Sequence, residues 1–142
     1  MVKRAKTPAK ALVRALDRPA FRTPFHSESS LPRFRDAIAE TIETINTGKT
    51  PQGTRLPSKG HVQDRAVRAK LDTLVERLAG LRATFDRLSR AGEIRHCGCK
   101  KASCGTYMFS ARAANEMDRQ RHQLLELAHQ IDPTAPRRFY DI

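Results

Sequence analysis

Apolar residues recur at helical spacing in three segments of the chain, most regularly over residues 61–90. There they alternate in steps of four and three, which is the spacing of a heptad seam over three repeats. The seam consists of Val67, Leu71, Leu74, Leu78, Leu81, Phe85 and Leu88. The pattern predicts one helix about 45 Å long at 1.5 Å per residue. We expect the seam to form an intramolecular core, with self-association as the alternative because two flanking helices would cover only about half of it.

Two shorter helices are predicted on either side of the long one. The first spans residues 31–47, with Ser29 or Ser30 as its N-cap and apolar residues at helical spacing. The third spans residues 111–131 and begins directly after Ser110, which is another good N-cap residue. Three helices of this kind pack on one another around a shared apolar core.

The remaining segments complete the predicted fold. Residues 49–60 hold two Pro and two Gly and predict a loop, whereas residues 93–110 predict two short strands around a cysteine cluster. The predicted class is mainly α: a three-helix core with one long heptad-patterned helix, a small zinc-pinned β-hairpin and a flexible basic N-terminal arm. The predicted divisions are an arm at 1–28, a helical domain at 29–132 with a zinc knuckle at 93–110, and a tail at 133–142.

The N-terminal arm is predicted to be flexible because prolines and charges interrupt it. Residues 1–28 carry seven Lys or Arg against two acidic residues. Leu12, Val13 and Leu16 are spaced for one or two amphipathic turns, but so short a helix is marginal alone in water. We therefore expect the arm to become ordered only on a partner.

The cysteines are the clearest chemical signal in the chain. Cys97, Cys99 and Cys104 follow the spacing C-x-C-x4-C, and no other cysteine is present. An odd number of cysteines within eight residues does not suit a secreted disulfide framework and favours a metal in a reducing, cytoplasmic compartment. Zn²⁺ in structural sites takes four ligands, mostly thiolate and imidazole. The spacing predicts a structural zinc that pins the hairpin.

Three cysteines leave one zinc ligand to be found, and two histidines are candidates. His96 is nearest in sequence, but adjacent residues of a strand point to opposite faces. His122 comes back to the level of the cysteines if the third helix folds back along the hairpin, since the travel along the strand and along the helix is similar, about 17 Å each. The sequence leaves both candidates open.

The cysteine spacing also resembles the zinc knuckle that follows the SET domain in lysine methyltransferases, over Cys97 to Tyr107. In that knuckle three cysteines of the same spacing recruit a fourth ligand from elsewhere in the chain. The resemblance implies a mode of metal coordination and no function, because the rest of this chain is too helical to be a SET domain.

The net charge of +12 points to a polyanionic partner. It arises from 27 Lys and Arg against 15 Asp and Glu, and nucleic acids are the commonest polyanions in a cell. No apolar run is long enough for a membrane span, so we expect no membrane partner. The cations expected to contact phosphates are Lys3, Arg4, Lys6, Lys10, Arg14, Arg18, Arg95, Lys100 and Lys101.

Two functions are compatible with these features. The first is a non-catalytic nucleic-acid-binding accessory protein, for DNA more than RNA, that contacts mainly the phosphate backbone; by analogy, it would suit a phage, mobile-element, recombination or defence assembly. The alternative is a structural or adaptor subunit that self-associates or binds a partner helix through residues 61–90. No set of acid, base and nucleophile stands out, so no enzymatic activity is expected.

Overall fold

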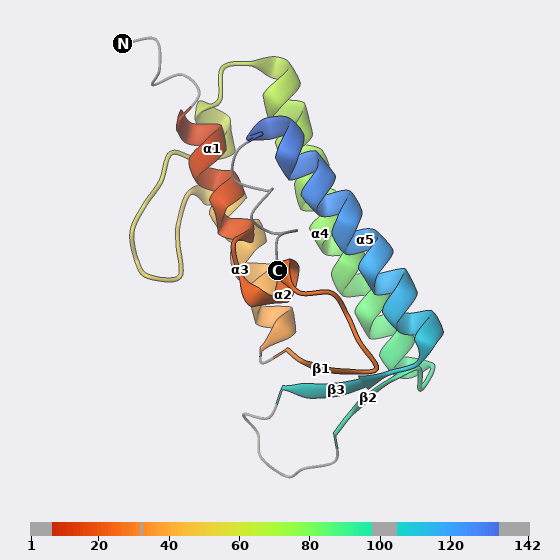
Figure 1. Ribbon diagram of the computed structural model, residues 1–142. Coiled ribbons are helices and arrows are strands. Elements are labelled where there is room, and N and C mark those ends of the chain that lie inside the picture. Colours follow the sequence, from red (N-terminus) through yellow and green to blue (C-terminus); the bar gives the residue numbers. More distant parts are fainter. Residues whose placement is uncertain (1–6, 32, 98–104, 134–142) are drawn as a thin grey trace.

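The computed structural model describes residues 7–31, 33–97 and 105–133. The chain is mainly helical and carries a small antiparallel sheet (Figure 1), in agreement with the predicted class. The helices are α1 (Thr7–Val13), the 3-10 turn η2 (Arg14–Leu16), α2 (Pro19–Arg22), α3 (Phe34–Thr47), the 3-10 turn η3 (Lys59–His61), α4 (Arg65–Arg90) and α5 (Ala111–Ile131). The strands are β1 (Glu28–Ser30), β2 (Ile94–His96) and β3 (Thr106–Phe109).

The two longest helices, α4 and α5, lie side by side and antiparallel (Figure 1). In the polar contacts between them, residue numbers fall along α4 as they rise along α5. These contacts join Arg87 to Glu116, Thr84 to Gln120 and Arg77 to Gln123. The third predicted helix therefore folds back along α4 and not along the hairpin.

The starts of two helices differ from the prediction. α4 begins at Arg65, not at residue 61, because the Asp64 carboxylate accepts hydrogen bonds from the free N–H groups of Ala66 and Val67. α3 begins at Phe34, and its first turn is not capped by Ser29 or Ser30 as predicted. Those two serines lie in strand β1, where backbone pairing with β3 occupies them.

The heptad seam of α4 is the centre of the core. Leu71, Leu74, Leu78, Leu81 and Phe85 are fully buried. α3 covers one side of the seam, with the ring of Phe34 centred 4.8 Å from that of Phe85, and α5 covers the other. The seam is thus packed against α3 and α5 within the chain, as expected. None of these five side chains is exposed for pairing with a helix of another molecule.

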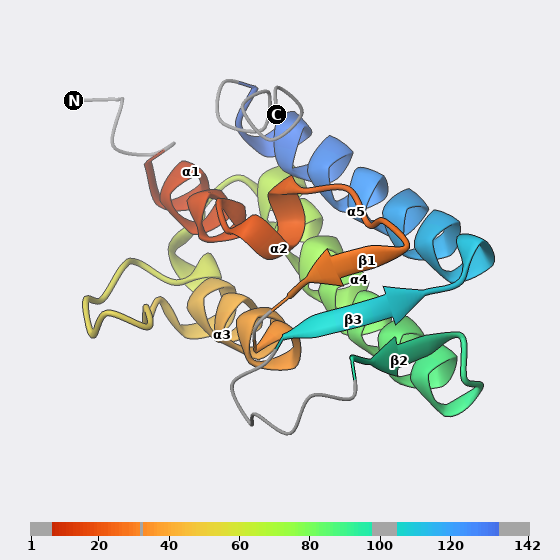
Figure 2. The same cartoon turned by 60° about the horizontal axis from the view of Figure 1, so that its bottom comes forward.

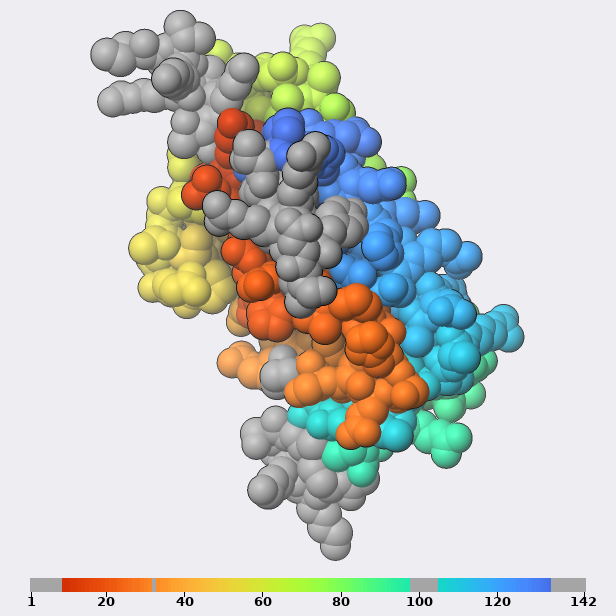
Figure 3. Space-filling view, in the orientation of Figure 1, coloured from red at the N-terminus to blue at the C-terminus, as the bar shows by residue number. Residues whose placement is uncertain are grey.

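The predicted flexible arm is wrong for residues 7–28, which are part of the core. Leu12, Val13, Leu16 and Phe21 have no exposed surface, and Phe25 is 5% exposed. Figure 3 shows the segment that follows α2 lying across the face of the molecule, next to α5 and β3. The interpretation from sequence weighted the charges and prolines and undervalued five large apolar side chains, which fill the space that α3 and α5 leave beside α4. Residues 1–6 lie outside the described part of the chain.

The sheet has three strands, not the two of the predicted hairpin. The strand order is β1-β3-β2, so β3 is central. Its Tyr107 lies opposite Ser29 of β1, and its Phe109 lies opposite Ile94 of β2. Figures 1 and 2 both place the sheet across one end of the helices. Its inner face packs on the bundle, where the ring of Tyr107 lies edge-on to Phe85 at 5.2 Å.

Candidate metal centre and basic surface

The sheet register brings together the two ends of the segment that contains the cysteine motif. The backbone N–H of Cys97 donates to the Thr106 carbonyl (3.1 Å), just beyond the last pair of β2 and β3. The carbonyl of Gly105 accepts from the Leu31 N–H (2.6 Å) on the other side. The chain therefore enters and leaves the motif on neighbouring strands. Cys99, Lys100, Lys101 and Cys104 lie outside the described residues.

His96 lies in β2, directly before Cys97. It pairs with Tyr107 in the sheet, and the two rings stand edge-on with their centroids 5.3 Å apart. Tyr107 continues this contact inward to Phe85, so the His96 ring lies on the side of the sheet that faces the helices. Strand alternation sends the next side chain, that of Cys97, toward the opposite face.

His122 lies on α5, away from the sheet. Its neighbours Gln120 and Gln123 contact Thr84 and Arg77, so this part of α5 is level with the middle of α4. The His122 Nε2 atom lies 3.8 Å from Asp118 Oδ2 and 3.3 Å from Arg121 Nη2. The structure does not bring His122 to Cys97, because α5 turns away from the strands at its first residue.

Among residues 7–31, 33–97 and 105–133, no three or more His, Cys, Asp or Glu side chains are grouped so that they could hold a metal ion. This finding concerns neither Cys99 nor Cys104. Cys97, the one cysteine that is described, is half-buried.

The sequence did not predict an ion pair near His122 between the buried Arg121 and the half-buried Asp118. Arg121 is 2% exposed and donates to Asp118 (2.9 Å) and to the carbonyl of Phe21 (3.3 Å). Asp118 also accepts from the backbone N–H of Phe25 (3.3 Å). The pair thereby ties α5 to the N-terminal segment. The position of Arg121 on the apolar side of the predicted helix was the signal for a buried ion pair. The sequence does not show which carboxylate it pairs with, because that depends on the fold.

The predicted phosphate-contacting residues fall into three groups. Lys10 and Arg14 lie on α1 and η2 and make no ion pair with the described residues, whereas Arg18 is ion-paired with Glu40 at 2.9 Å. Arg95 is exposed on β2 and donates to the Gly92 carbonyl at 3.3 Å. Lys3, Arg4, Lys6, Lys100 and Lys101 lie outside the described residues.

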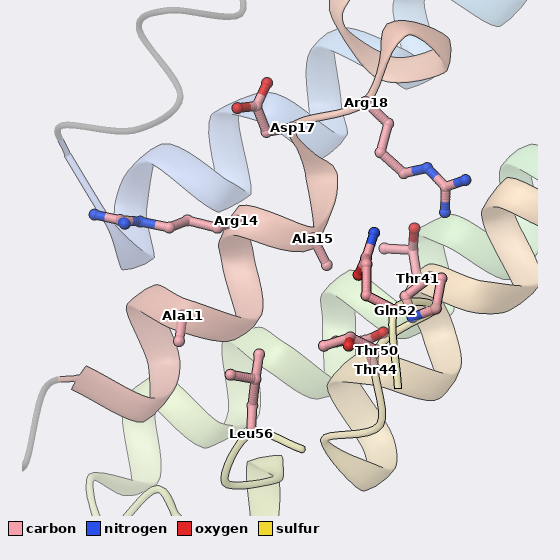
Figure 4. Close-up of a pocket in the computed structure, with 11 residues that line it drawn as sticks. Ala11, Arg14, Ala15, Asp17, Arg18, Thr41, Thr44, Thr50, Gln52 and Leu56 are labelled. Carbon is pink, nitrogen blue, oxygen red and sulfur yellow. The ribbon is translucent and has the colours of Figure 1, made fainter. Parts of the chain in front are cut away.

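Two of these arginines, Arg14 and Arg18, line a hollow of about 310 Å³ between η2, α3 and the loop after α3 (Figure 4). Figure 4 shows Arg14 extended away from Gln52, and Arg18 directed toward α3, where Glu40 holds it. The middle of the hollow is walled by alanine and threonine side chains. Its lining therefore offers no converging set of cations for a bound phosphate.

Most cations of the described part remain without an ion pair. The ion-paired cations are Arg18, Arg22, Arg33, Arg35, Lys59, Arg87 and Arg121. Those with no carboxylate of the described chain within ion-pair distance are Lys10, Arg14, Lys49, Arg55, Arg65, Arg68, Lys70, Arg77, Arg82, Arg90, Arg95, Arg112 and Arg119. All of this second group are exposed or half-exposed. Within the described part of the chain, the smaller share of the Lys and Arg residues is therefore ion-paired.

No family model, curated protein or solved structure matches this chain. None of the described helices is both long and apolar enough to cross a membrane.

Proposed function

We propose that this chain is a non-catalytic nucleic-acid-binding accessory protein. The observation that supports the proposal is the large set of exposed cations without ion pairs, spread over α1, α4, α5 and the loop after α3. Exposed cations of this kind can contact phosphates, and each such contact releases counterions from the nucleic acid. DNA is the favoured ligand, and the contacts are mainly to its phosphate backbone.

The test is the salt dependence of binding. The full chain is titrated into a labelled DNA duplex and a labelled single strand, and anisotropy is recorded between about 50 and 200 mM salt. Five phosphate contacts give a log–log slope of about −4.5, because each contact releases counterions. No binding at low salt, or an affinity that does not change with salt, contradicts the proposal.

We further propose that Cys97, Cys99 and Cys104 hold a structural Zn²⁺. The pairing of Cys97 with Thr106 supports this, since it brings the two ends of the cysteine segment onto neighbouring strands of a small sheet. A metal would stabilise such a sheet, because three strands of three or four residues carry few apolar contacts. Of the two histidine candidates, His96 is the proposed fourth ligand because it adjoins Cys97, whereas α5 carries His122 away along α4. The His96 ring lies against Tyr107 on the helix-facing side of the sheet, so metal binding requires the ring to turn away from that contact.

Zinc content tests this assignment. Elemental analysis of the purified chain is expected to give about one zinc per molecule, and Cys97→Ser is expected to lower it strongly. His96→Ala is expected to reduce the zinc content or affinity at least tenfold, whereas His122→Ala leaves both unchanged. A loss with His122→Ala and none with His96→Ala would show that the ligand choice is wrong. A metal-free wild-type protein, purified without chelator, would remove the zinc proposal altogether.

The alternative function, an adaptor that pairs through the long helix, has less support. The leucines that would form the interface are fully buried between α3 and α5. Pairing through that seam would require the bundle to open and to lose this burial. This loss of burial disfavours an adaptor function for the long helix.

A further inference from the structure

We propose that the β-hairpin of residues 49–55 enters the major groove of double-stranded DNA, with Lys49 and Arg55 on phosphates at the groove edges and Gln52 at the tip. The proposal rests on the proposed nucleic-acid function and names its docking element. Figures 1 and 3 show the loop after α3 projecting from the side of the bundle.

The projecting loop is a regular two-stranded turn and not an irregular coil. Lys49 and Arg55 form an antiparallel backbone bridge, and the Thr50 N–H donates to the Thr54 carbonyl at 3.0 Å. The Gly53 N–H closes the tip by donating to the Thr50 carbonyl, also at 3.0 Å. Gly53 has a φ of 87°, a conformation that glycine adopts without strain. The side chains from Pro51 to Arg55 are all exposed.

The base of the hairpin is fixed to α3, so its direction is set before any partner binds. The Gly48 carbonyl accepts a hydrogen bond from the Leu56 N–H (2.7 Å), and Thr44 Oγ1 donates to the Lys49 carbonyl (2.8 Å). A Cβ atom at Gly48 would lie 1.8 Å from the Leu56 carbonyl oxygen, so the two strands meet closely there. Leu56 packs against the apolar core. A rigid base lowers the entropy lost when the tip binds.

The charge on the hairpin has no stabilising role in the free protein. Lys49 and Arg55 occupy directly opposed positions, and like charges placed so are destabilising. Neither makes an ion pair within the described residues. The carboxylates nearest to the hairpin base are Glu40, which is engaged by Arg18, and Glu43, which lines the same hollow as Lys49. Opposed cations on a rigid projection are complementary to two phosphates that flank a groove.

The shape of the hairpin favours the major groove of B-form DNA. That groove is about 12 Å wide and admits a two-stranded ribbon, whereas the minor groove is about half as wide. Gln52 makes no side-chain hydrogen bond in the described structure, and its side chain lines the hollow of Figure 4. In the proposed complex the amide turns out of the hollow, where its donor and acceptor meet a base edge. Pro51 and Gly53 on either side of Gln52 keep the tip narrow.

The first test compares two double variants that remove equal charge. Lys49→Gln with Arg55→Gln is set against Arg82→Gln with Arg119→Gln, which are exposed and unpaired on α4 and α5. The hairpin variant is expected to lose about tenfold in affinity for duplex DNA and to lower the salt slope by about 1.8, the value for two phosphates. The control variant is expected to lose less than about threefold. Circular dichroism checks that both variants remain folded.

The second test uses duplexes of identical sequence in DNA and RNA. The major groove of A-form RNA is deep and narrow and excludes side chains. The wild-type chain is therefore expected to prefer the DNA duplex, and the hairpin variant to lose that preference. Gln52→Ala is expected to weaken DNA binding about threefold with an unchanged salt slope, since it removes no charge.

The outcomes separate the two proposals. Wild-type binding with equal losses in the two double variants, or equal affinity for the DNA and RNA duplexes, overturns the hairpin proposal and leaves the nucleic-acid function standing. No wild-type binding to either duplex or to a single strand overturns both. Unchanged DNA binding by the hairpin variant, together with lost binding to an acidic protein, shows that the surface serves a protein partner and also overturns the proposal.

Discussion

The N-terminal segment of residues 7–25 and the sheet end formed by β2 and β3 hold their places by different means. The first is held by side chains: four of its apolar residues have no exposed surface, and Arg121 and Asp118 bind its backbone. The second is held mainly by strand pairing, with Ile94 and Phe109 as its buried apolar residues. On the outer face of the sheet, Met108 is 45% exposed. A basic, proline-containing segment is therefore part of this core, whereas the strands on either side of the cysteine segment have no separate core.

The N-terminal segment is expected to lose most stability when a buried aromatic ring is removed from it. Phe21→Ala removes a fully buried ring and is expected to lower the free energy of unfolding by about 3–5 kcal/mol. Urea unfolding followed by circular dichroism measures it. Thr23→Ala, two residues further on and exposed, is the matched control and is expected to change stability by less than about 0.5 kcal/mol. A loss below about 1 kcal/mol for Phe21→Ala would show that the segment is the loose arm that the sequence suggested.

The second prediction acts on the sheet end alone. If zinc fastens the motif, a chelator is expected to raise the exchange rate of the Cys97 amide about 100-fold, equivalent to about 2.7 kcal/mol of lost local stability. That amide is hydrogen-bonded to Thr106 and reports on the pairing of β2 and β3. Amides of α4 around Leu78 are expected to keep their protection, because the bundle is buried independently of the metal. Native-state hydrogen exchange by NMR measures both sets.

Two results of that experiment contradict the comparison. Equal acceleration of the Cys97 and Leu78 amides would show that the bundle depends on the metal as much as the sheet does. No acceleration at either would show that strand pairing suffices to hold the sheet end. A chelator effect that disappears in Cys97→Ser is the control for nonspecific action of the reagent.

The long periodic segments were predictable from the sequence because periodicity reports directly on burial. Six of the seven seam residues that the pattern named on α4, Leu78 among them, are buried, and Val67 is half-buried. Sequence reasoning failed for residues 7–28 because one or two amphipathic turns are marginal alone, and the sequence does not show what they pack against. Their burial depends on a space between α3 and α5 that exists only in the folded bundle.

The third strand and the position of His122 were missed for a related reason. β1 has three residues, Glu28–Ser30, which is too short for an alternating pattern to identify. The placement of His122 depended on the direction of α5, and strand and helix lengths alone do not fix that direction. It is decided by the packing of α5 on α4, through contacts such as that of Thr84 with Gln120. The cysteine spacing, by contrast, needed no tertiary information, since a local motif carries its chemistry in its residue types.

The helix caps at the two ends of the bundle are expected to have smaller effects on stability. Ser110 caps α5 by accepting from the Ala113 N–H, and its hydroxyl donates to Glu93 at 2.6 Å, directly before β2. Asp64 caps α4 at the opposite end of that helix from the sheet. Ser110→Ala and Asp64→Ala are each expected to lower the free energy of unfolding by about 1 kcal/mol, because each leaves helix N–H groups without a side-chain partner.

The two cap variants differ in where they loosen the molecule. Ser110→Ala also removes the side-chain bond that joins the start of α5 to the residue before β2, so it is expected to speed exchange of the Cys97 amide even with metal present. Asp64→Ala is expected to leave that amide unchanged while lowering global stability by the same amount. Equal effects of both variants on Cys97 exchange would mean that the sheet end opens only with the whole bundle. A selective effect of Ser110→Ala means that the sheet end opens as a separate unit, which is the behaviour expected of a segment that depends on a metal fastener.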